Sequence, residues 1–104
     1  MQVFFSDQAF LDMEGVREYF DEVAPHKTDE IVLSIVDRVF LLEEYPLSGP
    51  EEPFLKSIGL DRRFLVEGNY KIIYRIEDNI YITQVFDARQ DPLKMVDNEN
   101  AQPI

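Results

Sequence analysis

Five cationic side chains in the second half of the chain have the types and spacing that could do chemistry: Arg62, Arg63, Lys71, Arg75 and Arg89. Arg63, Lys71 and Arg89 lie at strand or turn positions from which they could converge on one face of a sheet. Such a face could bind an anion, either a phosphate backbone or an acidic peptide. The alternative is a solvated face on which these cations form ordinary cross-strand ion pairs with Glu67, Glu77 and Asp78. Because exposed ion pairs are common and of small energy, the spacing alone favours the ion-paired face.

The other titratable residues indicate no second site. His26, the only histidine, stands beside Pro25 with no evident partner for acid–base work, so we interpret it as a loop residue. The pair Glu51-Glu52 falls in a predicted loop and receives no role. There is no Gly-rich phosphate loop and no nucleophile elbow, so the sequence implies no cofactor. A solvated helix face is favoured over a metal site for five further acids, because no His or Cys accompanies them: Asp12, Glu14, Glu18, Asp21 and Glu22.

Composition and charge narrow the class of protein. The chain has 104 residues, 45% of them hydrophobic, which suits a single folded domain with a modest core. It has no cysteine, no apolar run long enough for a membrane span and no signal-peptide pattern, so we expect a cytoplasmic protein with no membrane partner. The net charge is −11, and residues 1–60 hold 13 acidic and four basic residues. An acidic body repels phosphate backbones, so we expect no direct sequence-specific DNA binding.

The elements that would position the cations lie between residues 62 and 92. Three segments rich in Ile, Val, Phe and Tyr are separated by Glu67-Gly68-Asn69 and by Glu77-Asp78-Asn79. Such a pattern predicts consecutive antiparallel hairpins, that is, a three-stranded meander. In the middle strand Tyr70, Ile72, Tyr74 and Ile76 share the core face, and Lys71, Ile73, Arg75 and Glu77 share a half-wet, cationic face.

The first half of the chain predicts one short strand and two helices. Residues 3–5 form the strand, and Ser6 caps a helix that Pro25 ends. Thr28 is the expected cap of a second helix, which is apolar over most of its circumference and ends at Tyr45-Pro46. Residues 47–61 read as a connection. The predicted fold is α+β: an N-terminal strand and a two-helix hairpin packed on a small antiparallel sheet with the C-terminal meander, in one domain over residues 1–92. Residues 93–104 are polar and weakly patterned, so we expect a flexible tail.

Motifs in the second half of the chain resemble a known family. Tyr45-Pro46 with Gly49 comes first, and Arg62-Arg63 opens a strand. The runs NYKIIYRI (69–76) and VFDARQDP (85–92) follow. Together these motifs, and the order of the elements, resemble the RelE/ParE superfamily, the toxin half of bacterial type II toxin–antitoxin pairs. The ParE-like branch is the more similar one.

The resemblance implies a small cytoplasmic toxin that a cognate antitoxin neutralises. Antitoxins of the family wrap their toxin with a helix and an extended segment, which suits the over-apolar second helix. The implied antitoxin-binding residues are Val32, Val36 and Phe40. In the ParE-like branch the target is DNA gyrase. In the RelE-like branch the toxin cuts messenger RNA on the ribosome, using basic residues of the sheet face and a terminal Tyr or His.

Departures from the family motif separate these two activities. The family commonly closes with Val-x-His-x-Arg-Arg-Asp-Pro, whereas this chain has Asp87 at the histidine and Gln90 at the second arginine. A nuclease would therefore have to use Asp87 as its base, with Lys71 and Arg89 stabilising the transition state. The lost groups and the acidic body favour a ParE-like toxin that acts by binding gyrase through Arg62, Arg63, Lys71, Arg75 and Arg89. The alternatives are a ribosome-dependent endoribonuclease and a non-toxic member that keeps the antitoxin-binding fold.

Overall fold

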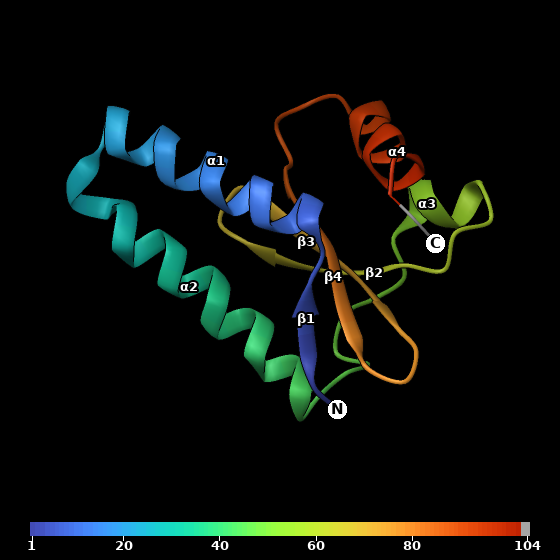
Figure 1. Cartoon of the computed structure of the whole chain (residues 1–104). Coiled ribbons are helices and arrows are strands. Elements are labelled where there is room, and N and C mark those ends of the chain that lie inside the picture. The colour runs from blue at the N-terminus through green and yellow to red at the C-terminus, as the bar shows by residue number, and fades with distance from the viewer. Residues whose placement is uncertain (103–104) are drawn as a thin grey trace.

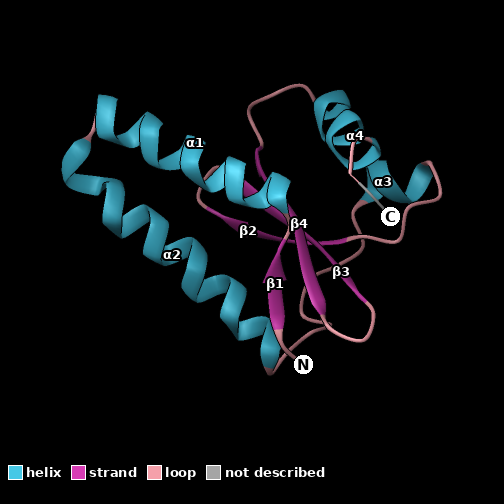
Figure 2. Cartoon of the chain, viewed as in Figure 1, coloured by secondary structure: helices cyan, strands magenta, loops and turns pink. Residues whose placement is uncertain are grey.

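A four-stranded sheet divides the molecule into two unequal layers (Figures 1 and 2). The computed structural model describes residues 1–102, and its sheet has the strand order β1-β4-β3-β2. The long helices α1 (Asp7–Val23) and α2 (Thr28–Phe40) form a hairpin over one face, around Ile72, Tyr74 and Ile82. The short helices α3 (Pro53–Ser57) and α4 (Pro92–Asn100) pack on the other face. None of the described helices is both long and apolar enough to cross a membrane.

The predicted meander is confirmed. Strands β2 (Arg63–Glu67), β3 (Tyr70–Ile76) and β4 (Ile80–Asp87) pair antiparallel in sequence order. Gly68 turns the first hairpin with φ 58°, a backbone region that glycine enters without a steric penalty. Strand β1 (Val3–Phe5) joins the edge of the sheet as expected. It runs parallel to β4, however, so the sheet is mixed, because the helices between the two strands allow a crossover that a short hairpin would not.

The start and end of α1 follow the sequence, but the start of α2 does not. The Ser6 side chain accepts a hydrogen bond from the Ala9 amide at 3.1 Å, and α1 ends before Ala24-Pro25. At α2 the capping residue is Lys27, without a side-chain hydrogen bond. Thr28, the expected cap, lies inside the helix with its hydroxyl buried and without a partner among the described residues. The expectation for Thr28 was wrong because the 3-10 turn Pro25–Lys27 leads directly into the helix.

The buried hydroxyl of Tyr74 anchors the connection between α2 and the sheet. It accepts a hydrogen bond from the Gly49 amide at 3.0 Å and donates one to the Pro46 carbonyl at 2.8 Å. A Cβ atom at Gly49 would come within 2.4 Å of the Phe64 carbonyl oxygen, so no larger residue fits there. Pro46 and Gly49 of the motif therefore hold the chain against the middle strand, whereas Tyr45 is 60% exposed.

The C-terminal segment corrects the sequence-based expectation of a flexible tail. Residues 92–100 form α4, which begins with Asp91 accepting a hydrogen bond from the Leu93 amide at 3.0 Å and with Pro92 in the first turn. Met95 is 1% exposed and packs with Leu55, Ile73 and Phe86 in a second hydrophobic cluster. The expectation failed because this face of the sheet is apolar and needs a cover. Residues 103–104 of the expected tail lie outside the described residues.

Replacing Met95 with Ala should lower the free energy of unfolding by about 2–4 kcal/mol, because the change leaves a cavity under α4. Leu93→Ala is the matched control in the same helix, since Leu93 is 63% exposed, and it should change stability by less than about 0.5 kcal/mol. Urea denaturation followed by circular dichroism measures both. Equal small effects would mean that α4 does not pack on the sheet in solution.

Candidate functional site

Lys71, the central cation of the sheet face, is held by a buried carboxylate. Glu52 caps α3, and its side chain is fully buried. One oxygen accepts a hydrogen bond from the Leu55 amide at 2.8 Å, and the other lies 2.6 Å from Lys71 Nζ. The same ammonium lies 4.4 Å from the centre of the Phe64 ring. A buried carboxylate needs a cation nearby. Lys71 is therefore the counter-ion of Glu52, and it helps to hold α3 in place as well as contributing a surface charge.

Arg62 is held in the same way by α4. Its Nε donates to Glu99 at 2.7 Å, and the Glu99 side chain is 1% exposed. The other Glu99 oxygen accepts a hydrogen bond from Gln84 Nε2 at 2.6 Å, and Gln84 also donates to the Met95 carbonyl at 2.9 Å. The buried pair therefore ties α4 to both the sheet and the start of β2.

Arg63 and Arg75 also have partners within the protein. Arg63 donates to the Gly49 carbonyl at 2.6 Å, which reinforces the connection that Tyr74 anchors. Arg75 forms an ion pair with Glu77 and lies 4.5 Å above the Tyr81 ring. Both guanidinium groups are thus fixed by local structure.

Arg89 is the most exposed of the five cations, with half of its side chain open to solvent. Its Nε and Nη2 donate to the two Asp87 oxygens at 2.9 and 2.8 Å, and its amide donates to Asp87 Oδ1 at 3.0 Å. These hydrogen bonds hold the pKa of Asp87 below its ordinary value, and the carboxylate in turn raises the pKa of Arg89. The guanidinium also lies 5.7 Å from the Tyr19 ring of α1.

Arg63 does not converge with Lys71, because its cross-strand neighbour is Tyr74 on the helical-hairpin face of the sheet. The other four predicted cations are ion-paired and form no free anion-binding cluster. The sequence favoured this arrangement, but most of the partners differ from those expected. Of the three expected acids only Glu77 pairs with one of these cations; Glu67 pairs with Arg38, and Asp78 accepts a hydrogen bond from Tyr81. Among residues 1–102, no group of His, Cys, Asp and Glu is placed to hold a metal ion.

The carboxylates that sequence reasoning missed are Glu52 and Glu99. Glu52 was left without a role in a loop, and Glu99 fell in the expected tail. The acid–proline steps Glu52-Pro53 and Asp91-Pro92 were the available signal, because an acidic cap followed by proline is typical of a helix start.

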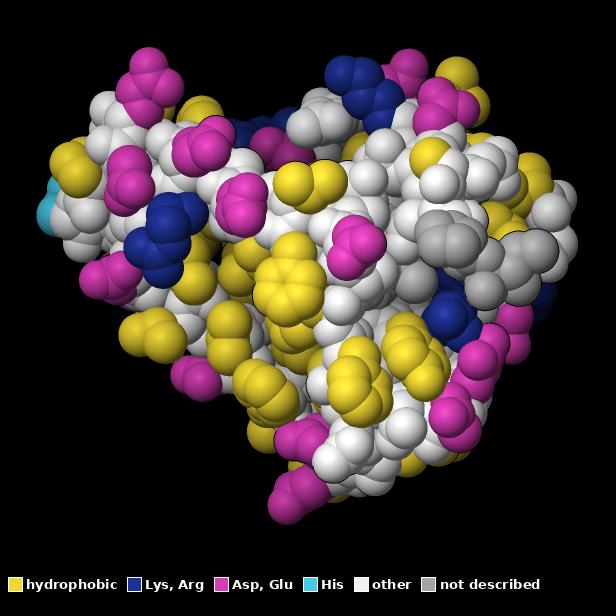
Figure 3. All heavy atoms as spheres, in the orientation of Figure 1, with side chains coloured by type: hydrophobic (Ala, Val, Ile, Leu, Met, Phe, Trp, Pro, Cys, Tyr) yellow, Lys and Arg dark blue, Asp and Glu magenta, His cyan; other side chains and the backbone are white. Residues whose placement is uncertain are grey.

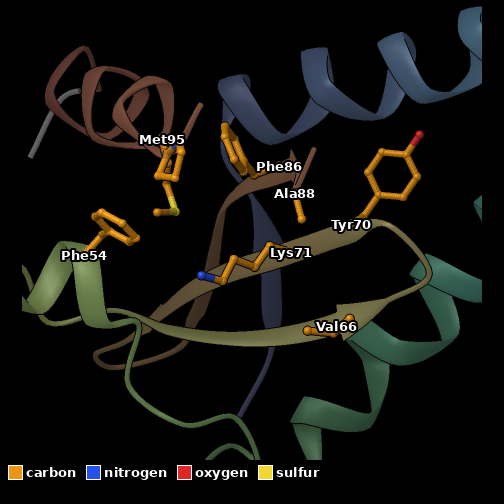
Figure 4. A pocket seen from close by; sticks show the side chains of 8 residues that line it. Phe54, Val66, Tyr70, Lys71, Phe86, Ala88 and Met95 are labelled. Atoms are coloured by element: carbon orange, nitrogen blue, oxygen red, sulfur yellow. The ribbon is translucent and has the colours of Figure 1, made fainter. Parts of the chain in front are cut away.

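A pocket of about 130 Å³ opens on this face of the sheet (Figure 4). Its wall is mainly apolar, and Lys71 is the one charged residue among those that line it: Phe54, Val66, Tyr70, Lys71, Phe86, Ala88, Pro92 and Met95. The wall thus combines side chains of α3, α4 and three strands. Burial raises the pKa of the Tyr70 hydroxyl. Arg89 itself does not line the pocket, but Ala88, its neighbour in the chain, does.

The helical hairpin carries the second predicted surface. Of the residues expected to bind an antitoxin, Phe40 is 48% exposed, whereas Val32 and Val36 are partly buried. Leu33, which was not singled out, is 59% exposed. Figure 3 shows hydrophobic side chains gathered between α1 and α2 and along α2.

Two further residues of the hairpin were weighed in the sequence. His26 lies in the exposed turn between the helices, as expected. Asp12 was expected on a solvated face, but it accepts a hydrogen bond from the Val85 amide at 2.9 Å, and burial raises its pKa. The expectation failed for Asp12 because this position of α1 lies against the end of β4.

Of the comparisons with known proteins, one shows the family and another the fold. A family model described as "ParE toxin of type II toxin-antitoxin system, parDE" matches residues 3–92. A solved structure, "Chromosomal ParDE TA system from P. aeruginosa", shares the fold with a TM-score of 0.70 at 20% sequence identity, over 84% of this chain and 95% of that chain. No curated protein matches the chain at a significant level. The family match ends where α4 begins.

The Glu52–Lys71 pair predicts an asymmetric response to mutation. Lys71→Met leaves a carboxylate buried without a cation and should lower the free energy of unfolding by about 3 kcal/mol. Adding Glu52→Gln should recover most of that loss, because the amide still caps Leu55 without a charge. Arg75→Met, at a partly exposed pair, is the control and should cost about 1 kcal/mol or less. Equal losses in urea denaturation for Lys71→Met and Arg75→Met would contradict the structural role of Lys71.

Proposed function

The chain belongs to the ParE toxin family of type II toxin–antitoxin systems, and from that premise we propose that it is a toxin that binds and poisons DNA gyrase. In its resting state a cognate antitoxin neutralises it in the cytoplasm. The observation that carries the choice of mechanism is the pairing of the sheet-face cations with carboxylates of the same chain. This pairing supports action by contact and not by RNA cleavage.

RNA cleavage needs a group that takes a proton and cations that stabilise the charged phosphate. Asp87 stands where the family motif commonly has histidine, but both its oxygens are occupied by Arg89 and its lowered pKa makes it a weak base. Lys71 faces the buried Glu52 at 2.6 Å. The chemistry of a ribosome-dependent nuclease therefore finds little support in this site.

The proposed gyrase-contacting surface centres on Arg89 and the neighbouring apolar pocket. The side chains of Arg62, Lys71 and Arg75 are only 19%, 20% and 24% exposed, against 50% for Arg89. Arg62, Lys71 and Arg75 would then shape the surface, and Arg89 would make the main polar contact, whereas Arg63 faces the helical hairpin. An exposed arginine next to a pocket lined by Phe54 and Phe86 has the composition of a protein–protein hot spot.

The antitoxin is proposed to cover the opposite side of the molecule, over α2 with Val32, Val36 and Phe40. The antitoxin would then contact α2, and gyrase the surface around Arg89 and the pocket. No cofactor is required for either contact, because each depends on shape, apolar area and charge.

A supercoiling assay with purified DNA gyrase tests the proposal. The chain should inhibit the reaction, and Arg89→Glu should raise the concentration needed for half-inhibition at least tenfold. Arg17→Glu is the matched control, since Arg17 is likewise 49% exposed and paired, with Asp29 of α2. Arg17 lies about 200° around α1 from Tyr19, the residue that Arg89 contacts, and the variant should inhibit as the natural chain does.

Gyrase activity that is unchanged at saturating protein would contradict the proposal. Codon-positioned cuts in translated messages that disappear in Asp87→Asn would instead establish the ribosome-dependent nuclease. Normal growth with both processes intact would indicate a non-toxic member of the family.

A further inference from the structure

The exposed side of α2 carries a stripe in which acidic and apolar residues alternate. Glu30, Leu33, Asp37 and Phe40 follow one another at spacings of three, four and three, so they lie on one face of the helix. All four side chains are exposed, Leu33 by 59% and Phe40 by 48%. Exposed apolar residues in line on one face are typical of a surface that a partner covers.

The charge around this stripe has one sign. Residues 7–45 contain 11 acidic and three basic residues. Among the described ion pairs, Arg17 is taken by Asp29 and Arg38 by Glu67, which leaves Lys27 as the one cation of the hairpin outside them. Nine exposed acids of the hairpin take part in no described ion pair: Asp7, Glu14, Glu18, Asp21, Glu22, Glu30, Asp37, Glu43 and Glu44. Acidic side chains accordingly surround the hydrophobic ones in Figure 3.

We propose that the segment covering this stripe is a cationic amphipathic helix, with Lys or Arg interleaved among apolar side chains. A helix laid along α2 can present side chains at the same spacing of three and four residues. Basic residues would meet Glu30 and Asp37 while apolar residues cover Leu33 and Phe40. An acidic segment of equal hydrophobicity is excluded from this surface by like-charge repulsion.

This inference rests on the proposed function in one respect, because the natural occupant is the antitoxin. It adds the chemistry of the antitoxin segment, which the family does not specify for this chain. Charge attraction between the antitoxin segment and the hairpin would speed their association, and their affinity would fall as the salt concentration rises.

Binding of the purified cognate antitoxin, measured by calorimetry at 50 and 500 mM NaCl, tests the proposal. The affinity should fall at least tenfold between these concentrations. Glu30→Lys with Asp37→Lys should weaken binding at least tenfold at 50 mM NaCl and much less at 500 mM. Asp61→Lys with Asp97→Lys makes the same charge change at exposed sites outside the hairpin and should stay within about threefold.

Two results would overturn the inference. One is tight antitoxin binding with an affinity that does not depend on salt. The other is an affinity that stays unchanged or rises in the variant with Glu30→Lys and Asp37→Lys. Complete absence of antitoxin binding at either salt would instead contradict the proposed function. A second measurement keeps the two apart. It uses a pair of synthetic helical peptides with the same Leu face and either Lys or Glu interleaved.

The Lys peptide should bind the natural chain. Its affinity for the variant chain with Leu33→Ser and Phe40→Ser should be at least tenfold lower. These two side chains are exposed, so their replacement should leave the fold intact, which circular dichroism checks. The Glu peptide should not bind. Equal binding of both peptides, or equal binding of the Lys peptide to the natural and Ser variants, would overturn the inference whatever the antitoxin does.

Discussion

Two buried carboxylates constrain the rest of the structure. Glu52 and Glu99 are closed to solvent in their side chains, and each must face a cation because an isolated buried charge is far more costly than a paired one. Lys71 and Arg62 meet this need. The same two pairs attach α3 and α4 to the second face of the sheet, over an apolar cluster that would otherwise be open to water. The two buried ion pairs therefore determine both where α3 and α4 lie and why Lys71 and Arg62 are paired inside the protein.

This constraint leaves the basic-looking strand region with most of its cations already paired. Half of the Lys and Arg residues fall between residues 61 and 92, yet their charge is largely balanced inside the protein. What stays accessible on this face is an apolar pocket beside Arg89, and on the other layer an apolar stripe among acids. Both are features for contact with proteins. A toxin that works by binding, restrained by a second protein, fits these surfaces better than a nuclease does.

Much of this fold follows from local patterns, and the failures share a physical reason. Alternation and turn residues predict the meander, and Ser6 and Pro25 bound the first helix, because these signals act between near neighbours. The buried pairs join Glu52 to Lys71 and Glu99 to Arg62, residues 19 and 37 positions apart, and no local pattern reports such contacts. The α4 helix was missed because its polar sequence hides one buried methionine and one buried glutamate. The pocket depends on that helix, so it could not be predicted either.

The most direct test of a toxin that acts by binding gyrase is the order in which synthesis fails in living bacteria. DNA and protein synthesis are followed by pulse-labelling in the minutes after this chain alone is induced. Our account predicts that DNA synthesis falls first and protein synthesis follows. Protein synthesis that falls first, with DNA synthesis still running, would contradict it and would show that the paired cations do not prevent an attack on translation.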